Sequence, residues 1–214
     1  MRLLARLRAI TADAGHDPDG LRIVAITKTW PVEVARAALE AGIERLGENR
    51  VQEALPKVAA LPDAEWHMVG SLQSNKARRA VEAFAVIHSV GSPELMARLE
   101  GMAGDLDRHP RLLLQVNVSG ESSKSGMAPG TLADVAVPRS AELVGLMTMA
   151  PNGASEPEAR AIFGRLRGLR DELQQRLGIG LPELSMGMSA DAEAAAAEGA
   201  TLVRIGTALF GPRA

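Results

Sequence analysis

The feature that most constrains the fold is a regular alternation of short apolar runs with stretches rich in Ala, Glu and Arg, from one end of the chain to the other. The runs with the length and composition of strands number eight, and they start at Leu21, Glu44, Glu65, Ala85, Arg111, Glu142, Glu183 and Thr201. The stretches between them are typical of helices. This alternation predicts an α/β protein in which helices cover a parallel sheet closed into a (β/α)8 barrel. An open doubly wound sheet would show the same alternation, but the number of strands favours closure.

The composition and the amino-terminal segment predict how the chain is organised into domains. The chain has 214 residues, 46% of them hydrophobic, and its glycines and prolines are spread along it rather than gathered in a linker. We therefore expect residues 1–214 to form a single domain. The amino-terminal segment MRLLARLRAI places Leu3, Leu4, Leu7 and Ile10 on one stripe of a helix. This pattern predicts packing on the barrel rather than on a membrane, and no apolar stretch is long enough to cross a bilayer.

Composition also excludes several classes of function. The 24 basic and 26 acidic residues give a net charge of -2, which provides no general attraction to nucleic acid or anionic lipid. The chain has no cysteine, so disulfides and thiolate chemistry are excluded, and a reducing, cytoplasmic compartment is expected. His67 and His88 each lie in an expected strand, with no metal-ligand spacing and no carboxylate expected to cluster with them. We interpret both as core histidines and expect no metal site.

Polar and small residues follow nearly every expected strand. Because the functional groups of (β/α)8 barrels lie at the carboxyl ends of the strands, these residues predict a site at that end. Lys28 closes the first strand, and Pro31 opens the helix that follows. A partly desolvated amine at this position favours its neutral, nucleophilic form, so Lys28 is a candidate for Schiff-base chemistry. A lysine that only leaves the sheet for solvent would give the same pattern.

Two strand ends near the carboxyl terminus are candidate anion sites. Ser189 is predicted to cap a helix with Asp191 in its first turn, and Gly206-Thr207 form a second turn from strand to helix. Neighbouring helix starts after the last two strands are a frequent phosphate site in barrels. Arg204 lies within the last strand and needs a partner there. That partner is either a carboxylate such as Glu48 or the ring nitrogen of a bound heterocycle.

Two other polar segments carry weaker signals. The basic stretch Ser74–Arg79 is short and has no aromatic residues, so it is read as a solvated helix start rather than a nucleic-acid site. The segment Gly120–Gly126 has the composition of a phosphate loop but not the order G-x-x-x-x-G-K-[ST]. We expect it to be a mobile loop at the rim of the barrel.

Taken together, these segments closely resemble the pyridoxal phosphate homeostasis proteins, a single-domain family related to the amino-terminal barrel of alanine racemase. The resemblance runs from about Ile23 to Gly211. The matching segments are AITKTWP, GENRVQE, WHMVGSLQSNK, IHSV, QVNVSGESSKSGM, GLMTMAP, SMGMSADAEAA and VRIGTALFG. The chain departs from the usual family pattern at Thr27, Ser71 and Gly91, which leaves the expected cofactor site intact and affects its rim.

The resemblance implies that pyridoxal 5′-phosphate is held as an internal aldimine on Lys28. It implies a phosphate group near the last two helix starts, an arginine facing the pyridine nitrogen and an asparagine in the pocket wall. The cofactor-binding residues that it implies are Lys28, Asn49, Ser189, Arg204, Gly206 and Thr207. An arginine at the ring nitrogen disfavours protonation of that nitrogen and so weakens the cofactor as an electron sink. The implied function is a monomeric carrier without catalytic residues, which buffers pyridoxal phosphate and passes it to apoenzymes.

Two enzyme classes are alternatives. In alanine racemase the lysine works with a tyrosine from a second, β-rich domain, and this chain has no tyrosine and no such domain. A histidine or serine could still serve as the other acid or base of a racemase-like enzyme. In a class I aldolase-like barrel, Lys28 would attack a carbonyl substrate, and the paired helix starts would hold a substrate phosphate.

Overall fold

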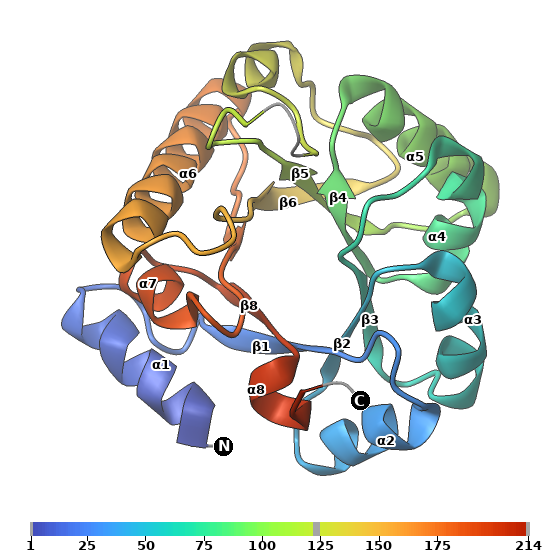
Figure 1. The fold of residues 1–214 in the computed structure, drawn as a ribbon. Helices are drawn as coiled ribbons and strands as arrows, with labels where there is room; N and C mark the ends of the chain where they lie inside the picture. The colour runs from blue at the N-terminus through green and yellow to red at the C-terminus, as the bar shows by residue number, and fades with distance from the viewer. Residues whose placement is uncertain (1, 122–124, 213–214) are drawn as a thin grey trace.

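The computed structural model describes residues 2–121 and 125–212, and its eight parallel strands close into a barrel in chain order. Figure 1 shows the ring of strands with the helices around it. The strands are β1 (Arg22–Ile26), β2 (Arg45–Glu48), β3 (Glu65–Met68), β4 (Val86–Val90), β5 (Arg111–Gln115), β6 (Glu142–Met147), β7 (Glu183–Ser185) and β8 (Leu202–Ile205). The barrel closes because β8 pairs with β1, with Arg22 opposite Leu202. The predicted (β/α)8 barrel is confirmed, and the open sheet is excluded.

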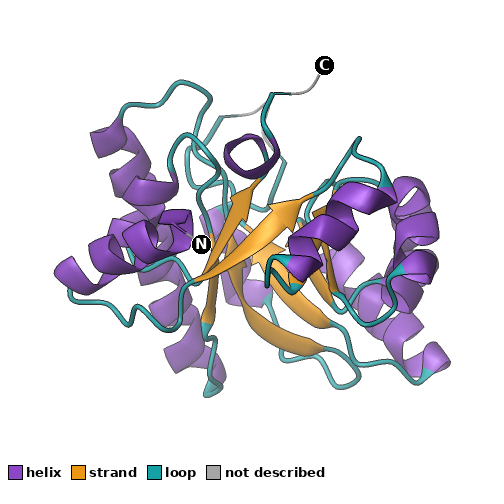
Figure 2. Ribbon diagram, turned by 90° about the horizontal axis from the view of Figure 1, so that it is seen from below, coloured by secondary structure: helices purple, strands orange, loops and turns teal. Residues whose placement is uncertain are grey.

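The helices alternate with the strands and enclose them, as the side view in Figure 2 shows. The α-helices are α1 (Arg2–Asp13), α2 (Val32–Glu40), α3 (Val51–Ala60), α4 (Ala77–Ala83), α5 (Pro93–Leu106), α6 (Glu156–Leu177), α7 (Ala192–Ala197) and α8 (Thr207–Phe210), and short 3-10 helices span Ser74–Lys76 and Pro129–Asp134. Every strand is shorter than the apolar run that predicted it. The polar residues that end each run leave the ladder for the loops, where side chains can be exposed at the barrel end.

Helix α1 packs beside α7, on the side of the barrel where the chain begins and ends its circuit (Figure 1). Leu7 is fully buried, while Leu3, Leu4 and Ile10 are partly buried against the main hydrophobic core. This packing confirms the prediction for the amino-terminal stripe. Among the helices of the described ranges, none combines the length and apolar character needed to cross a membrane.

The core has two parts because successive residues of a strand face opposite sides. The larger part lies between the strands and the surrounding helices. A smaller cluster fills the barrel and contains Val24, Ile26, Val86, Leu113, Val144, Met147 and Leu202. Gly47 leaves room for this cluster, since a Cβ there would lie 2.6 Å from Ile26 Cδ1 and 3.0 Å from Val24 Cγ1, and these side chains would have to shift. The polar side chains described below share this interior with the smaller cluster.

Candidate functional site

Strands β1 and β2 bring Lys28 and Asn49 to the same end of the barrel. In the parallel register, Ile26 lies opposite Gly47. Lys28 and Asn49 each follow these paired residues by two positions, so they leave neighbouring strands at the same level. Both residues are half-buried. The structure thus places these two predicted residues where the sequence expects them.

The backbone on both sides of Lys28 is held by side chains of α3. Lys57 Nζ donates to the carbonyl oxygen of Thr27 at 2.8 Å. The N–H of Thr29 donates to the carboxylate of Glu53, and Thr29 has a left-handed φ of 67°. A non-glycine residue in this region is strained unless its surroundings hold it. These contacts fix the direction in which the Lys28 side chain leaves the strand.

The same contacts include a buried ion pair. Lys57 Nζ lies 2.7 Å from Glu48 Oε1, and the Thr27 hydroxyl donates to the same oxygen at 2.7 Å. Glu48 is fully buried, and this burial raises the pKa of its carboxyl group. Its Oε2 has no hydrogen-bond partner among the described residues. The sequence reading offered Glu48 as a possible ionic partner of Arg204, and that prediction is wrong because Lys57 occupies this role.

The ends of β7 and β8 meet through Ser189. Its hydroxyl accepts the N–H of Ala208, in the first turn of α8, at 3.2 Å. Gly206 is the residue before α8, and Thr207 is the first residue of that helix. Ser189 and Thr207 are exposed and Gly206 is half-buried. The predicted turn from strand to helix at Gly206-Thr207 is confirmed, and Ser189 lies directly beside it.

Ser189 does not, however, cap the helix after β7, as the sequence reading predicted. Helix α7 begins at Ala192, so Asp191 precedes it rather than lying in its first turn. The reason is a tight turn in which the Met188 N–H donates to Asp191 Oδ1 at 2.6 Å, which delays the start of the helix. This turn frees the Ser189 hydroxyl to reach α8.

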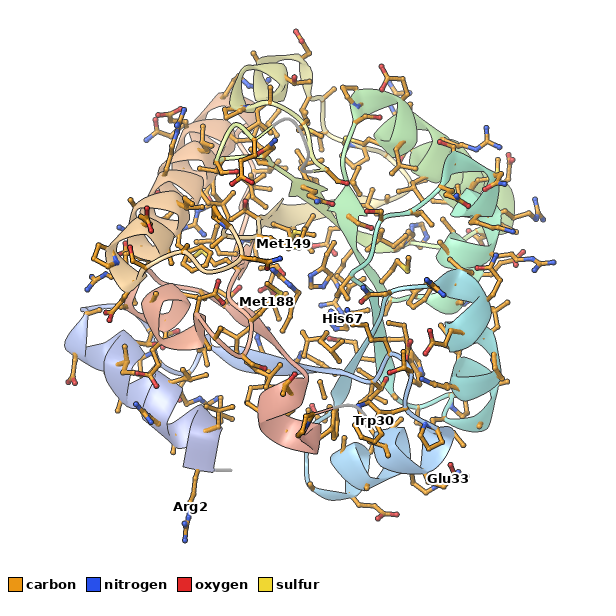
Figure 3. The ribbon with its side chains drawn as sticks, viewed as in Figure 1. Arg2, Trp30, Glu33, His67, Met149 and Met188 are labelled. Atoms are coloured by element: carbon orange, nitrogen blue, oxygen red, sulfur yellow. The ribbon has the colours of Figure 1, made fainter. Side chains whose placement is uncertain are left out.

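Helix α8 is also fixed against the loop that follows Lys28. The Trp30 and Phe210 rings lie with their centroids 6.2 Å apart and their planes tilted by 57°. Trp30 is labelled in Figure 3 at the side of the barrel occupied by α2 and α8. This contact joins the loop that follows Lys28 to the end of α8.

Arg204 is buried inside the barrel and binds uncharged oxygen atoms. Its Nη1 donates to Ser185 Oγ at 2.5 Å, and its Nη2 donates to the carbonyl oxygen of Thr148 at 2.8 Å. Burial lowers the pKa of the guanidinium to about 10, and the charge of Asp191 acts in the opposite direction. The guanidinium is therefore still protonated at neutral pH, with no carboxylate among its described hydrogen-bond partners.

The hydrogen bonds continue from Arg204 across the barrel. Ser185 Oγ lies 2.8 Å from His88 Nδ1, and His88 Nε2 lies 2.7 Å from His67 Nδ1. His67 Nε2 in turn lies 2.8 Å from Glu65 Oε1. Figure 3 shows His67 inside the ring of strands. The prediction of core histidines is confirmed, but the expectation that no carboxylate would join them is wrong.

At the amino end of the barrel, this series of hydrogen bonds ends at Glu65, which forms ion pairs with two arginines. Glu65 Oε2 accepts from Arg111 Nη2 at 2.6 Å, and Glu65 Oε1 lies 3.0 Å from Arg45 Nε. The hydrogen bond from His67 and the contact with Arg111 lower the pKa of Glu65 to about 2. Burial lowers the pKa of His67 and that of His88, so both rings are neutral at pH 7. Within the described ranges, no cluster of His, Asp and Glu residues is arranged to hold a metal ion.

Asn49 also borders a cavity at the carboxyl end of the barrel. A cavity of about 410 Å³ is lined by Asn49, Arg50, Ser71, Lys76 and neighbouring residues of β3 and the segment after it. The basic segment from Ser74 begins with a 3-10 helix and continues into α4, with exposed arginines, as predicted. Residues 122–124 of the loop predicted to be mobile lie outside the described residues, so that prediction stays open.

Sequence reasoning missed the α3 side chains and the extent of the buried network. Alternation along β3 could have revealed part of the latter, because Glu65 and His67 are two residues apart and so face the same side of the strand. Nothing local marks Lys57 as a partner of the backbone at Thr27, since 30 residues separate them.

The fold and the site together define a class: a (β/α)8 barrel with a strand-end lysine, a buried arginine and two adjoining helix starts at one end. The model of the alanine racemase N-terminal domain matches residues 2–214. The pyridoxal phosphate homeostasis protein of Pseudomonas aeruginosa is 44% identical over 219 residues, covering 99% of this chain and 93% of that protein. The corresponding Synechocystis protein is 41% identical over 203 residues, covering 92% and 93%. The chain belongs to the family of pyridoxal phosphate homeostasis proteins.

Solved structures agree with this assignment. PipY of Synechococcus elongatus, in its form with pyridoxal phosphate bound, has a TM-score of 0.84 and 42% identity, covering 96% of this chain and 100% of that one. Alanine racemase of Clostridium difficile has a TM-score of 0.77 at 14% identity, covering 98% of this chain and 56% of that one. The second similarity concerns the fold alone.

Proposed function

We propose that this protein binds pyridoxal 5′-phosphate covalently at Lys28 and serves in pyridoxal phosphate homeostasis rather than in catalytic turnover. The observation that carries the proposal is that Lys28, Arg204 and the turn into α8 belong to the neighbouring strands β1 and β8, towards their carboxyl ends. It is supported by the 42% identity to a relative solved with this cofactor. Bound pyridoxal phosphate would supply an aldehyde that reacts with primary amines.

The residues present fit the chemical groups of this cofactor. The Ser189 hydroxyl accepts from Ala208, so its own proton can be donated to a phosphate oxygen. The exposed Thr207 hydroxyl and the backbone at Gly206 add donors beside it. Asn49, at the level of Lys28, would line the pocket.

Arg204 would face the pyridine nitrogen. A guanidinium can only donate hydrogen bonds, so it favours a ring nitrogen that is unprotonated and accepts. A pyridine held in this form withdraws electrons weakly, which suits storage of the cofactor better than carbanion chemistry. We therefore propose that the protein is a carrier, with residues 1–214 forming one domain that acts as a cytoplasmic monomer and delivers the cofactor to apoenzymes.

The test is the visible absorption spectrum with added pyridoxal phosphate, before and after borohydride reduction, followed by peptide mass mapping. We expect a reducible band and a label on the Lys28 peptide. Lys28→Ala should abolish both. Lys76→Ala, which removes a lysine from the neighbouring cavity, should retain both and is the matched control. A label on any other lysine in the wild-type protein would contradict the assignment.

Turnover is tested separately. The loaded protein is incubated with L-alanine in deuterated water, and exchange at Cα is followed by NMR. We expect no exchange above that given by free pyridoxal phosphate. Exchange that is lost in Lys28→Ala would instead establish the racemase-like alternative, and a protein that stays colourless with the cofactor would favour the aldolase-like one.

A further inference from the structure

The chain of hydrogen bonds inside the barrel has only one possible direction. The ionised carboxylate of Glu65 only accepts, so neutral His67 donates from Nε2 and accepts at Nδ1. At the other end Arg204 only donates to Ser185 Oγ, and the Ser185 proton goes to His88 Nδ1, which neutral His88 leaves unprotonated. His88 then carries its proton on Nε2 and donates to His67 Nδ1. Each hydroxyl and ring proton is thus assigned by the two ends of the chain.

This chain links the two ends of the barrel. Glu65 lies at the start of β3, whereas Arg204 lies near the end of β8. Ser185 and His88 are fully buried and His67 is 1% exposed, so no solvent competes for their hydrogen bonds. A fully satisfied buried network holds its members in one arrangement, because every alternative leaves a polar group without a partner.

We propose that Ser185, His88 and His67 are positioning residues that fix the Arg204 guanidinium for binding the pyridine ring of the cofactor. The proposal rests on the proposed function, since it requires pyridoxal phosphate in this site. Arg204 has a second tether, the carbonyl oxygen of Thr148, which is backbone and does not vary with side-chain changes. The Ser185 hydroxyl is therefore the side chain that sets the rotation of the guanidinium plane, and His88 sets the Ser185 hydroxyl.

Substitutions at position 88 can separate the two hydrogen bonds of His88, the one accepted from Ser185 and the one donated to His67. In His88→Asn the side-chain oxygen can take the place of Nδ1 and still accept from Ser185, while the donor to His67 is lost. In His88→Gln the amide nitrogen can take the place of Nε2, while Ser185 loses its acceptor. Both variants lose one buried hydrogen bond, so a merely structural role predicts the same result for both.

The measurements are the dissociation constant for pyridoxal phosphate and the position of the visible absorption band. We expect His88→Gln to weaken binding about tenfold and to shift the band, whereas His88→Asn stays within about threefold of wild type, a tenfold change being about 1.4 kcal/mol. Ser185→Ala should resemble His88→Gln. Thr11→Val is the control, because it also removes a buried hydroxyl bond, to Leu7 in α1, away from the site. Equal effects of His88→Asn and His88→Gln, or wild-type spectra in both, would overturn the proposal.

A measurement without cofactor distinguishes failure of this inference from failure of the proposed function. Long-range ¹H–¹⁵N NMR correlations in the cofactor-free protein report the histidine tautomers. We expect neutral rings protonated on Nε2 for both His67 and His88. A proton on Nδ1 of either ring contradicts the proposed relay, that is, the chain of hydrogen bonds from Arg204 to Glu65, whether or not the protein binds pyridoxal phosphate. The expected tautomers in a protein that never binds the cofactor would reject the cofactor site and, with it, the positioning role.

Discussion

The two ends of the barrel treat buried charge differently. At the amino end, cations meet carboxylates: Arg22 donates to both oxygens of Glu183 at 2.7 Å, and Arg45 and Arg111 contact Glu65. At the carboxyl end, the buried Arg204 binds a hydroxyl and a carbonyl oxygen. The charge of these amino-end residues is neutralised within the fold, whereas Arg204 keeps its charge with no carboxylate among its described hydrogen-bond partners. The first arrangement serves stability, and the second can recognise a ligand.

Next to Lys28, the Lys57 ammonium binds both a carboxylate, that of Glu48, and a carbonyl oxygen, that of Thr27. Replacing Lys57 should give the largest loss of stability. In Lys57→Met the carboxylate of Glu48 stays buried without its cation, so we expect a loss of about 3–5 kcal/mol in the free energy of unfolding. Urea denaturation measures this. Glu48→Gln combined with Lys57→Met should recover part of the loss, because no uncompensated charge then remains. If both variants are equally unstable, the ion pair is not the cause.

The buried histidines predict a pH dependence that sharpens the contrast. Their pKa values lie below the ordinary 6.5 in the folded protein, so below that pH the unfolded state binds more protons. The contribution of these two histidines to the free energy of unfolding should be fully present above pH 6.5. It should decrease below that pH, by up to about 1.4 kcal/mol per pH unit for each histidine. Urea denaturation at pH 7.5, 6.5 and 5.5 measures the slope, which should be smaller in His88→Asn than in wild type. Replacement of the exposed His109 by Gln is the control. An unchanged slope in His88→Asn contradicts the prediction.

The pair formed by Arg22 and Glu183 at the amino end lies outside the hydrogen-bond chain to Arg204, so it should affect stability without affecting the cofactor. Glu183→Gln weakens the bonds from Arg22 and from the Thr201 hydroxyl, and we expect a loss of about 1–3 kcal/mol. The dissociation constant for pyridoxal phosphate should stay within twofold of wild type at a temperature where the variant is folded. A tenfold weaker affinity would show that the two ends are not separable in this way.

The smallest predicted effect is at Ser189. It is exposed and, within the described part of the chain, its side chain makes one hydrogen bond, from the Ala208 N–H, so Ser189→Ala should change the free energy of unfolding by about 0.5 kcal/mol or less. Binding of pyridoxal phosphate should weaken several-fold, corresponding to about 1 kcal/mol for one lost hydrogen bond. Inorganic phosphate should compete less effectively with the cofactor in this variant than in wild type. Unaltered affinity would place the phosphate group elsewhere.

Several features could be predicted from the sequence because their signals are local. Eight apolar runs separated by helical stretches indicate a parallel sheet, since parallel strands need crossover helices, and the number of strands favours the closed barrel that is found. Lys28, Gly206 and Thr207 could be placed at strand ends because polar residues that follow an apolar run leave the sheet at its carboxyl end. The helix start at Ser189 was misplaced because the turn at Met188 depends on one side-chain contact.

Only the tertiary structure decided which side chains meet. The partner of the Arg204 side chain is Ser185 and not the predicted Glu48. Strand β7 pairs with β8, and the Ser185 and Arg204 side chains both point into the barrel. The relay joins residues of β3, β4, β7 and β8, and its longest step spans 97 residues of sequence. Periodicity determines which face of a strand a residue occupies, whereas barrel closure determines what lies across from it. The sequence by itself therefore determined the barrel and the end that carries the candidate site, and the closed sheet decided how its buried charges are held.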